Sequence, residues 1–220
     1  MGNRNQAHFG HLTTQIGARD VFAEVDPDQI ASVIAGAPLA CVVANTSDGL
    51  IANHVPLLFD KSGDLIGHFA LANDMHRIVD DGQEILAIFR GVDGYISPNS
   101  YPSKQEHHRH VPTWNYQIVH VYGAISFQHD ARSKRAAIGL LTRDQERRVN
   151  GVNAWRMADA PTDYMLEMLD KIVAFRIKVT KTVAKSKLSQ NRDIHDFDGA
   201  VQALKLRGNE ALAGRMLAKR

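Results

Sequence analysis

The sequence predicts a mainly β protein with flanking helices, an α+β chain built on an antiparallel barrel. Short runs rich in β-branched and aromatic residues follow one another with tight turns between them. At residues 47–49 an Asp-Gly pair separates two apolar runs, which is a strong hairpin signal. A single short helical pattern, near residues 73–82, interrupts the strands between residues 39 and 96. Strands joined in this way pair antiparallel, which favours a barrel over a sheet of βαβ units.

The elements follow from apolar spacing and from the residues that end each run. Asp26 and Pro27 suit the N-cap and the first position of a helix, and Gly36 ends that helix. Strands are predicted over 39–45, 50–60, 65–71, 84–90, 113–123 and 172–179. Amphipathic helices are predicted over 130–150, after Pro161, and over 197–217.

Length and composition are those of one globular domain with an appendage. The chain has 220 residues, of which 44% are hydrophobic and 23% are charged. We expect a flexible N-terminal extension over residues 1–19, a barrel domain over 20–192 and a C-terminal helical appendage over 193–220.

Charge, cysteine content and apolar runs limit the possible partners. The formal net charge is +2, which does not by itself indicate a nucleic-acid partner. The longest apolar runs, such as residues 38–44, are too short to span a bilayer, so no membrane partner is expected. Cys41 is the single cysteine, which rules out an internal disulfide and fits a cytoplasmic protein.

The stretch over residues 94–123 carries most of the chemistry. It holds four of the five tyrosines, one of the two tryptophans and four histidines, and prolines interrupt its first half. From residue 113 it predicts a strand, on which Thr113, Asn115 and Gln117 share one face and Trp114 and Tyr116 the other. Hydrogen-bonding groups gather at one end of this strand, which suits the mouth of a barrel that holds a polar ligand with a flat ring.

Five short motifs carry a resemblance to a known family. YISPNSYPSK and VPTWNYQIVHVYG lie in this stretch, and the others are LIANHVPLL at 50–58, GHFALAN at 67–73 and KLSQNR at 187–192. Together they resemble the signature of the PaiB-type family of FMN-binding negative transcriptional regulators, over about residues 20–195 and in the family's order. The resemblance implies a flavin-binding split β-barrel, FMN as its cofactor and a homodimer.

The resemblance and the hydrogen-bonding side chains of the chain together predict which residues contact FMN. These are Asn53, His54, Ser97, Ser103, Lys104, Thr113, Trp114, Asn115, Tyr116, Gln190 and Arg192. No Gly-rich phosphate loop is present, so side chains must bind any phosphate. Residues 178–192 include five basic residues and no acid, and such a run can neutralise the phosphate of the flavin.

Metal binding and redox catalysis are two further kinds of chemistry on which the residues bear. His107 and His110 have an i, i+3 spacing but stand in a polar loop without cysteine, so no metal site is predicted. A bound flavin can support a flavin-dependent oxidoreductase activity, but the sequence names no proton donor. The catalytic residues therefore stay unassigned, and the enzyme class stays open.

Two other functions remain open at this point. In the first, the chain is a DNA-associated negative regulator whose barrel binds no flavin and serves for dimerisation. The basic side of the helix predicted over 130–148 and the basic run over 178–192 motivate this alternative. In the second, the aromatic stretch is only core and dimer interface, where aromatic residues are enriched.

Overall fold

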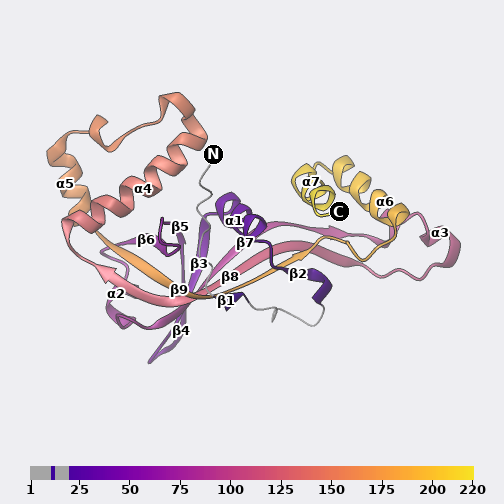
Figure 1. Cartoon of the computed structure of the whole chain (residues 1–220), viewed down its shortest axis with the longest axis horizontal. Coiled ribbons are helices and arrows are strands. Elements are labelled where there is room, and N and C mark those ends of the chain that lie inside the picture. The colour runs from indigo at the N-terminus through magenta and orange to yellow at the C-terminus, as the bar shows by residue number, and fades with distance from the viewer. Residues whose placement is uncertain (1–10, 13–19) are drawn as a thin grey trace. The chain divides into compact units, whose positions relative to one another are not determined.

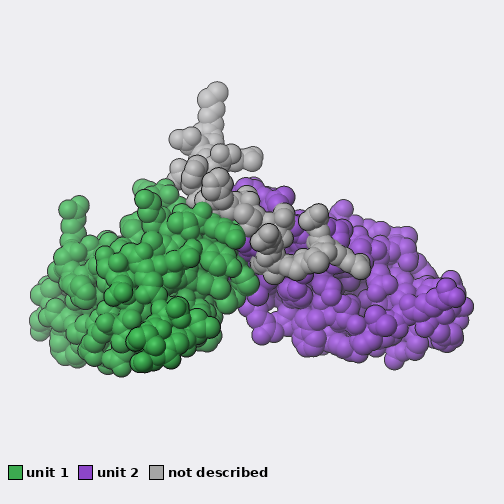
Figure 2. Space-filling model, turned by 90° about the horizontal axis from the view of Figure 1, so that it is seen from below, with its two compact units in different colours: residues 1–12, 37–89, 120–182 green, residues 13–36, 90–119, 183–220 purple. Residues whose placement is uncertain are grey.

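The computed structural model describes residues 11–12 and 20–220, so most of the predicted extension over 1–19 lies outside the described residues. The chain divides into two compact units (Figure 2). Unit 1 comprises residues 1–12, 37–89 and 120–182, and unit 2 comprises residues 13–36, 90–119 and 183–220. The bounds predicted for the barrel and the C-terminal appendage stay a prediction.

Nine strands of the described chain form one sheet (Figure 1). The order is β4-β3-β7-β8-β9-β6-β5, and β1 and β2 both pair with β9. The strands are β1 His11–Leu12, β2 Ala23–Glu24, β3 Leu39–Thr46, β4 Gly49–Pro56, β5 Leu58–Phe59, β6 Leu65–Ala70, β7 Glu84–Ile96, β8 Thr113–Gln128 and β9 Ile172–Lys187. The pairs β3–β4, β3–β7, β5–β6, β6–β9 and β2–β9 are antiparallel, and β1 runs parallel to β9. The predicted antiparallel β structure with flanking helices is confirmed.

Unit 1 contains the barrel. The predicted hairpin is present: Thr46 pairs with Gly49, whose φ of 105° suits glycine in the tight turn. Strands β4 and β6 also contact each other, so the sheet curls back on itself. Helices α2 (Met75–Ile78), α4 (Ala131–Asn150) and α5 (Thr162–Asp170) flank it, with the 3₁₀ turns η3 (Gly151–Asn153) and η4 (Met157–Asp159) between the last two. Helix α4 packs against β6 and α5.

Unit 2 is organised around a C-terminal helix pair. Its helices are α1 (Pro27–Gly36), α3 (Lys104–His107), α6 (Ile194–Leu206) and α7 (Glu210–Ala218), with the 3₁₀ turns η1 (Asp20–Phe22) and η2 (Pro98–Ser100). Its apolar cluster consists of Ile96, Tyr101, Leu188, Phe197, Ala200, Val201, Leu204, Leu212, Ala213 and Met216. The single helix predicted over 197–217 is wrong, because Gly208 adopts a φ of 76° and Asn209 caps a new helix by accepting from the Leu212 N–H at 3.3 Å. No helix among the described residues is long and apolar enough to cross a membrane.

Two histidines of unit 1 make its stability depend on pH. Burial lowers the pKa of His68 and of His120 below their ordinary value of 6.5, and His68 Nδ1 has no hydrogen-bond partner among the described residues. The unfolded chain therefore binds more protons than the folded chain just below pH 6.5, so the free energy of unfolding falls as the pH falls through that range.

We expect the double variant His68→Gln, His120→Gln to lose less stability than the wild type between about pH 7 and 5, since each histidine contributes up to about 1.4 kcal/mol per unit of pKa shift. Urea unfolding at both pH values measures the difference. The same acid-induced loss in both proteins would contradict the assignment.

Candidate functional site

The candidate site is a cavity of ≈ 320 Å³ in unit 2, where β8 begins and β9 ends. Its lining combines two cations with hydroxyl and amide groups and a small apolar rim. The lining residues are Phe22, Val111, Pro112, Thr113, Asn115, Lys187, Ser189, Asn191 and Arg192. Three of them, Thr113, Asn115 and Arg192, are among the residues that the resemblance assigns to FMN.

Asn115 lines this cavity and has a buried side-chain oxygen without a partner among the described residues. Asn115 and Gln117 lie on the inward face of β8, and their side chains are 0% and 2% exposed. The Asn115 amide donates to Ser189 Oγ at 2.8 Å, whereas its Oδ1 has no partner among the described residues. A buried polar atom without a partner costs about 1–3 kcal/mol, so this oxygen favours a ligand that donates a hydrogen bond.

Lys187 supplies a partly desolvated positive charge. Its Nζ donates to Thr113 Oγ1 at 2.5 Å, and no ion pair of Lys187 occurs among the described residues. Burial lowers the pKa of Lys187, and the positive charges of Lys185 and Arg192 lower it further. An anion in the cavity would offset all three effects, because it favours the charged ammonium.

Arg192 is held in place by an aromatic ring and a histidine. Its guanidinium lies 4.5 Å from the centre of the Tyr101 ring, and its NH1 lies 3.3 Å from His110 Nδ1. Because a guanidinium only donates, Nδ1 is the acceptor, and the proton of a neutral His110 sits on Nε2. That nitrogen lies 2.8 Å from Ser103 Oγ and 3.3 Å from Asp196 Oδ2. The arginine is thus oriented before any ligand arrives.

Four other predicted residues of unit 2, two serines, a lysine and a glutamine, form hydrogen bonds within the chain. Ser97 caps its own turn by accepting from the Asn99 N–H at 3.2 Å. Ser103 donates to the buried Asp196 carboxylate at 2.8 Å, and Lys104 hydrogen-bonds Asn99. Gln190 closes the turn after β9, where its Oε1 accepts from the Leu188 N–H at 2.7 Å.

The other predicted residues are not part of this lining. Trp114 and Tyr116 occupy the opposite face of β8: Trp114 is 49% exposed and donates to Asp93 at 2.9 Å, and Lys185 lies 5.7 Å from the Tyr116 ring. Asn53 and His54 belong to unit 1. There Asn53 accepts from Asn73 at 2.7 Å, and His54 is exposed.

Six lining residues are not among the predicted contacts, namely Phe22, Val111, Pro112, Lys187, Ser189 and Asn191. The signal for three of them was present in the basic run over 178–192 and in the motif over 187–192. Chemically, the cavity offers two cations, hydroxyl groups and one free acceptor, which suits an anion that also carries hydroxyl groups. Within residues 11–12 and 20–220, no group of three His, Cys, Asp or Glu side chains is placed to hold a metal ion.

Comparison with known proteins gives a family for most of the chain. Residues 18–181 match the family model described as "Putative FMN-binding domain". The match ends before Lys187, so four of the nine lining residues of the cavity lie beyond it. Over 188 residues the chain is 34% identical to the protease synthase and sporulation protein PAI 2 of Bacillus subtilis, a similarity that covers 83% of this chain and 86% of that protein.

Solved structures share the fold at low sequence identity. The flavocytochrome Anf3 from Azotobacter vinelandii superposes with a TM-score of 0.56 at 14% identity, covering 84% of this chain and 78% of that one. The FAD and heme binding protein from Mycobacterium smegmatis also gives a TM-score of 0.56 at 14% identity, covering 81% and 79% of the two chains. These neighbours support the predicted split-barrel fold.

Proposed function

Because the chain belongs to the PaiB-type family of FMN-binding domains, we propose that it binds FMN and that the ribityl phosphate arm of the flavin occupies the Lys187 cavity of unit 2. The family match supports FMN as the cofactor. One observation carries the proposed placement: the same cavity is lined by two cations and by a residue with an unpartnered oxygen. The cations are Lys187 and Arg192, which form no ion pair among the described residues, and the oxygen is Asn115 Oδ1.

The ribityl phosphate arm fits each feature of this cavity. A phosphate takes charge-assisted hydrogen bonds from an ammonium and a guanidinium, which here are Lys187 and Arg192. A ribityl hydroxyl can donate to Asn115 Oδ1, the acceptor that lacks a partner. A cavity of ≈ 320 Å³ suits this arm and leaves the isoalloxazine ring outside it. The flavin would supply any redox chemistry when bound.

We further propose that the protein is a homodimer with the flavin ring at the subunit interface. Unit 2 exposes apolar groups that a partner subunit would cover: Val111 is 70% exposed, Trp114 49% and Tyr95 44%. The centres of the Trp114 and Tyr95 rings lie 6.1 Å apart, so they form one aromatic patch. Such patches mark interfaces or ligand sites.

Titration with FMN tests the binding proposal. We expect flavin fluorescence to be quenched in a saturable way at micromolar FMN or below, with an absorbance spectrum shifted from that of free flavin. Light scattering of the same sample should give twice the mass of the 24.4 kDa chain. Absence of binding at micromolar FMN would end the proposal, and a monomeric FMN complex would refute the intersubunit placement alone.

A second candidate is the DNA-associated regulator, and one observation favours it. Arg135, Arg143 and Arg147 are exposed on helix α4 and form no ion pair among the described residues. A gel-shift assay with the region upstream of its own gene, at several salt concentrations, tests this candidate. Binding without sequence preference that is lost at moderate salt would reduce it to nonspecific charge.

A further inference from the structure

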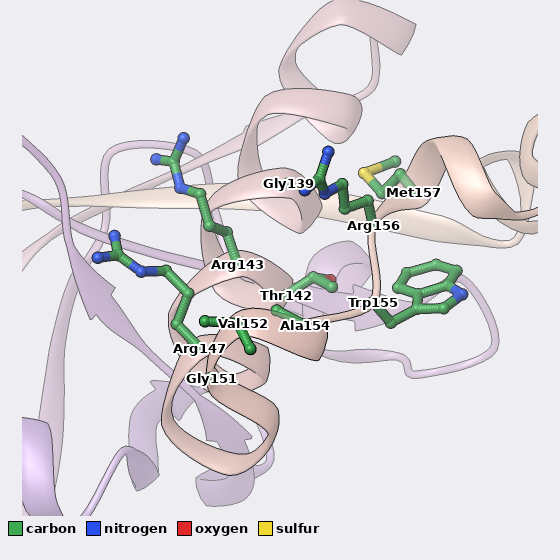
Figure 3. A pocket seen from close by; sticks show the side chains of 10 residues that line it. All are labelled: Gly139, Thr142, Arg143, Arg147, Gly151, Val152, Ala154, Trp155, Arg156 and Met157. Atoms are coloured by element: carbon green, nitrogen blue, oxygen red, sulfur yellow. The ribbon is translucent and has the colours of Figure 1, made fainter.

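A second cavity, of ≈ 560 Å³, lies in unit 1 between helix α4 and the segment over 151–157 that follows it (Figure 3). Its volume falls within the range of about 300–1,000 Å³ that is typical of small-molecule sites. Glu146 ties the two walls together, since its Oε2 accepts from the Trp155 N–H at 3.0 Å and from Asn150 Nδ2 at 2.7 Å. These hydrogen bonds hold the segment over 151–157 against helix α4.

One part of this cavity is apolar. Val152, Trp155 and Met157 line it, and the first two are 97% and 41% exposed, so their apolar surface is open to a ligand. Gly139 opens the opposite wall, because a Cβ added there would meet only Met157 Sδ, at 3.6 Å. A larger side chain at position 139 would fill this space.

The charged part consists of three arginines. Arg143 and Arg147 leave α4 toward the same side, one helical turn apart, and Arg156 reaches back toward the helix from the following segment (Figure 3). No carboxylate within residues 20–220 forms an ion pair with any of them, whereas Asp144 on the same helix pairs with Arg148 at 2.9 Å. Three arginines without an ion-pair partner among the described residues therefore lie beside an apolar wall, in a cavity whose frame also includes the Glu146 carboxylate.

We propose that this cavity binds a small amphiphilic carboxylate, an organic acid with an apolar body. The apolar body would cover Val152, Trp155 and Met157, and the carboxylate would accept hydrogen bonds from the arginines. Guanidinium groups bind carboxylates in bidentate geometry, which gives both affinity and selectivity for charge. The site is separate from the flavin cavity, since all its lining residues belong to unit 1.

The sequence allows a direct readout of this site. Trp114 and Trp155 are the two tryptophans, so the variant Trp114→Phe leaves Trp155, a lining residue, as the sole indole fluorophore. We expect decanoate to change the Trp155 fluorescence in a saturable way. Decanol, its uncharged counterpart, should bind at least about tenfold more weakly.

Four further variants, each made in the Trp114→Phe background, test the roles of the lining residues, and one of the four is a control outside the lining. Arg143→Gln and Arg156→Gln should each weaken decanoate binding about tenfold. Arg135→Gln is the matched control, because Arg135 is exposed on the same helix but does not line the cavity, and it should leave the affinity unchanged. Circular dichroism checks that every variant is folded.

Gly139→Leu should abolish binding by filling the cavity, and calorimetry gives a second measure of affinity.

Four outcomes would overturn the proposal. They are no saturable response to decanoate, equal binding of decanol, equal losses in Arg135→Gln and Arg143→Gln, and undiminished binding in a folded Gly139→Leu variant. Duplex DNA provides the remaining comparison. DNA binding that depends on Arg143 and Arg156, in a protein that does not respond to decanoate, would assign the arginines to nucleic acid instead.

Discussion

Replacing Lys187 by methionine should weaken FMN binding by about 10- to 150-fold, the loss expected when one hydrogen bond between charged groups worth about 1.5–3 kcal/mol is removed. Methionine keeps the length and the apolar stem of lysine. The fold should tolerate the change because the Lys187 ammonium is already partly desolvated and repelled by Lys185 and Arg192, as its lowered pKa indicates. Fluorescence titration with FMN measures the effect.

Lys185→Met is the matched control for this prediction. Lys185 stands two residues earlier on β9, and it lies 5.7 Å from the Tyr116 ring and does not line the cavity. We expect its loss to change FMN affinity by less than about threefold, since surface charges beyond direct contact are screened by salt. Equal losses in Lys185→Met and Lys187→Met would show that the overall positive charge, and not the cavity, determines binding.

The second large effect is expected at Gly199 on helix α6. A Cβ at this position would lie 2.4 Å from the Ser100 carbonyl oxygen and 2.6 Å from Pro102 Cδ. Neither is the free end of a flexible side chain, so the helix or the 98–102 segment must shift. Overpacking of this kind costs about 1–3 kcal/mol or more, and we expect Gly199→Ala to reach the upper end of that range. Urea unfolding measures the loss.

Gly214→Ala controls for the change in helix propensity. Gly214 lies within helix α7, and a Cβ there would have nothing within 4 Å. Because alanine is favoured over glycine inside a helix by about 0.8–1.0 kcal/mol, this variant should be as stable as the wild type or more so. Stability losses of the same size in both variants would show that the close approach of Gly199 to Ser100 is not the cause.

Local pattern was enough to predict the strand that carries the site. The alternation along β8 predicted that Asn115 and Gln117 share a face, and both are buried, whereas Trp114 on the other face is half exposed. The turn at Gly49 and the N-cap-and-proline start of α1 likewise depend on adjacent residues alone. These features need no long-range information, because each is set by the periodicity of a strand or the φ preference of one residue.

Contacts between distant parts of the chain could not be predicted. Ser103 was assigned to the ligand, and its hydroxyl donates to Asp196, which is 93 residues away in the sequence. Lys185 and Lys187 belong to the same basic run and point to the same face of the strand by spacing, yet Lys187 is the one that donates to Thr113, 74 residues away in the sequence. By contrast, the break between α6 and α7 had a local signal, since Gly208 followed by Asn209 is a helix stop and a new cap.

Riboflavin has the same ring and ribityl chain as FMN but no phosphate, so comparing the affinities for the two flavins tests most directly where the phosphate binds. If the phosphate lies between Lys187 and Arg192, the wild-type protein should bind FMN at least about 100-fold more tightly than riboflavin, since two charge-assisted contacts are at stake. Lys187→Met should reduce that ratio about tenfold or more by weakening FMN binding alone. Equal affinity for the two flavins in the wild type would contradict the account.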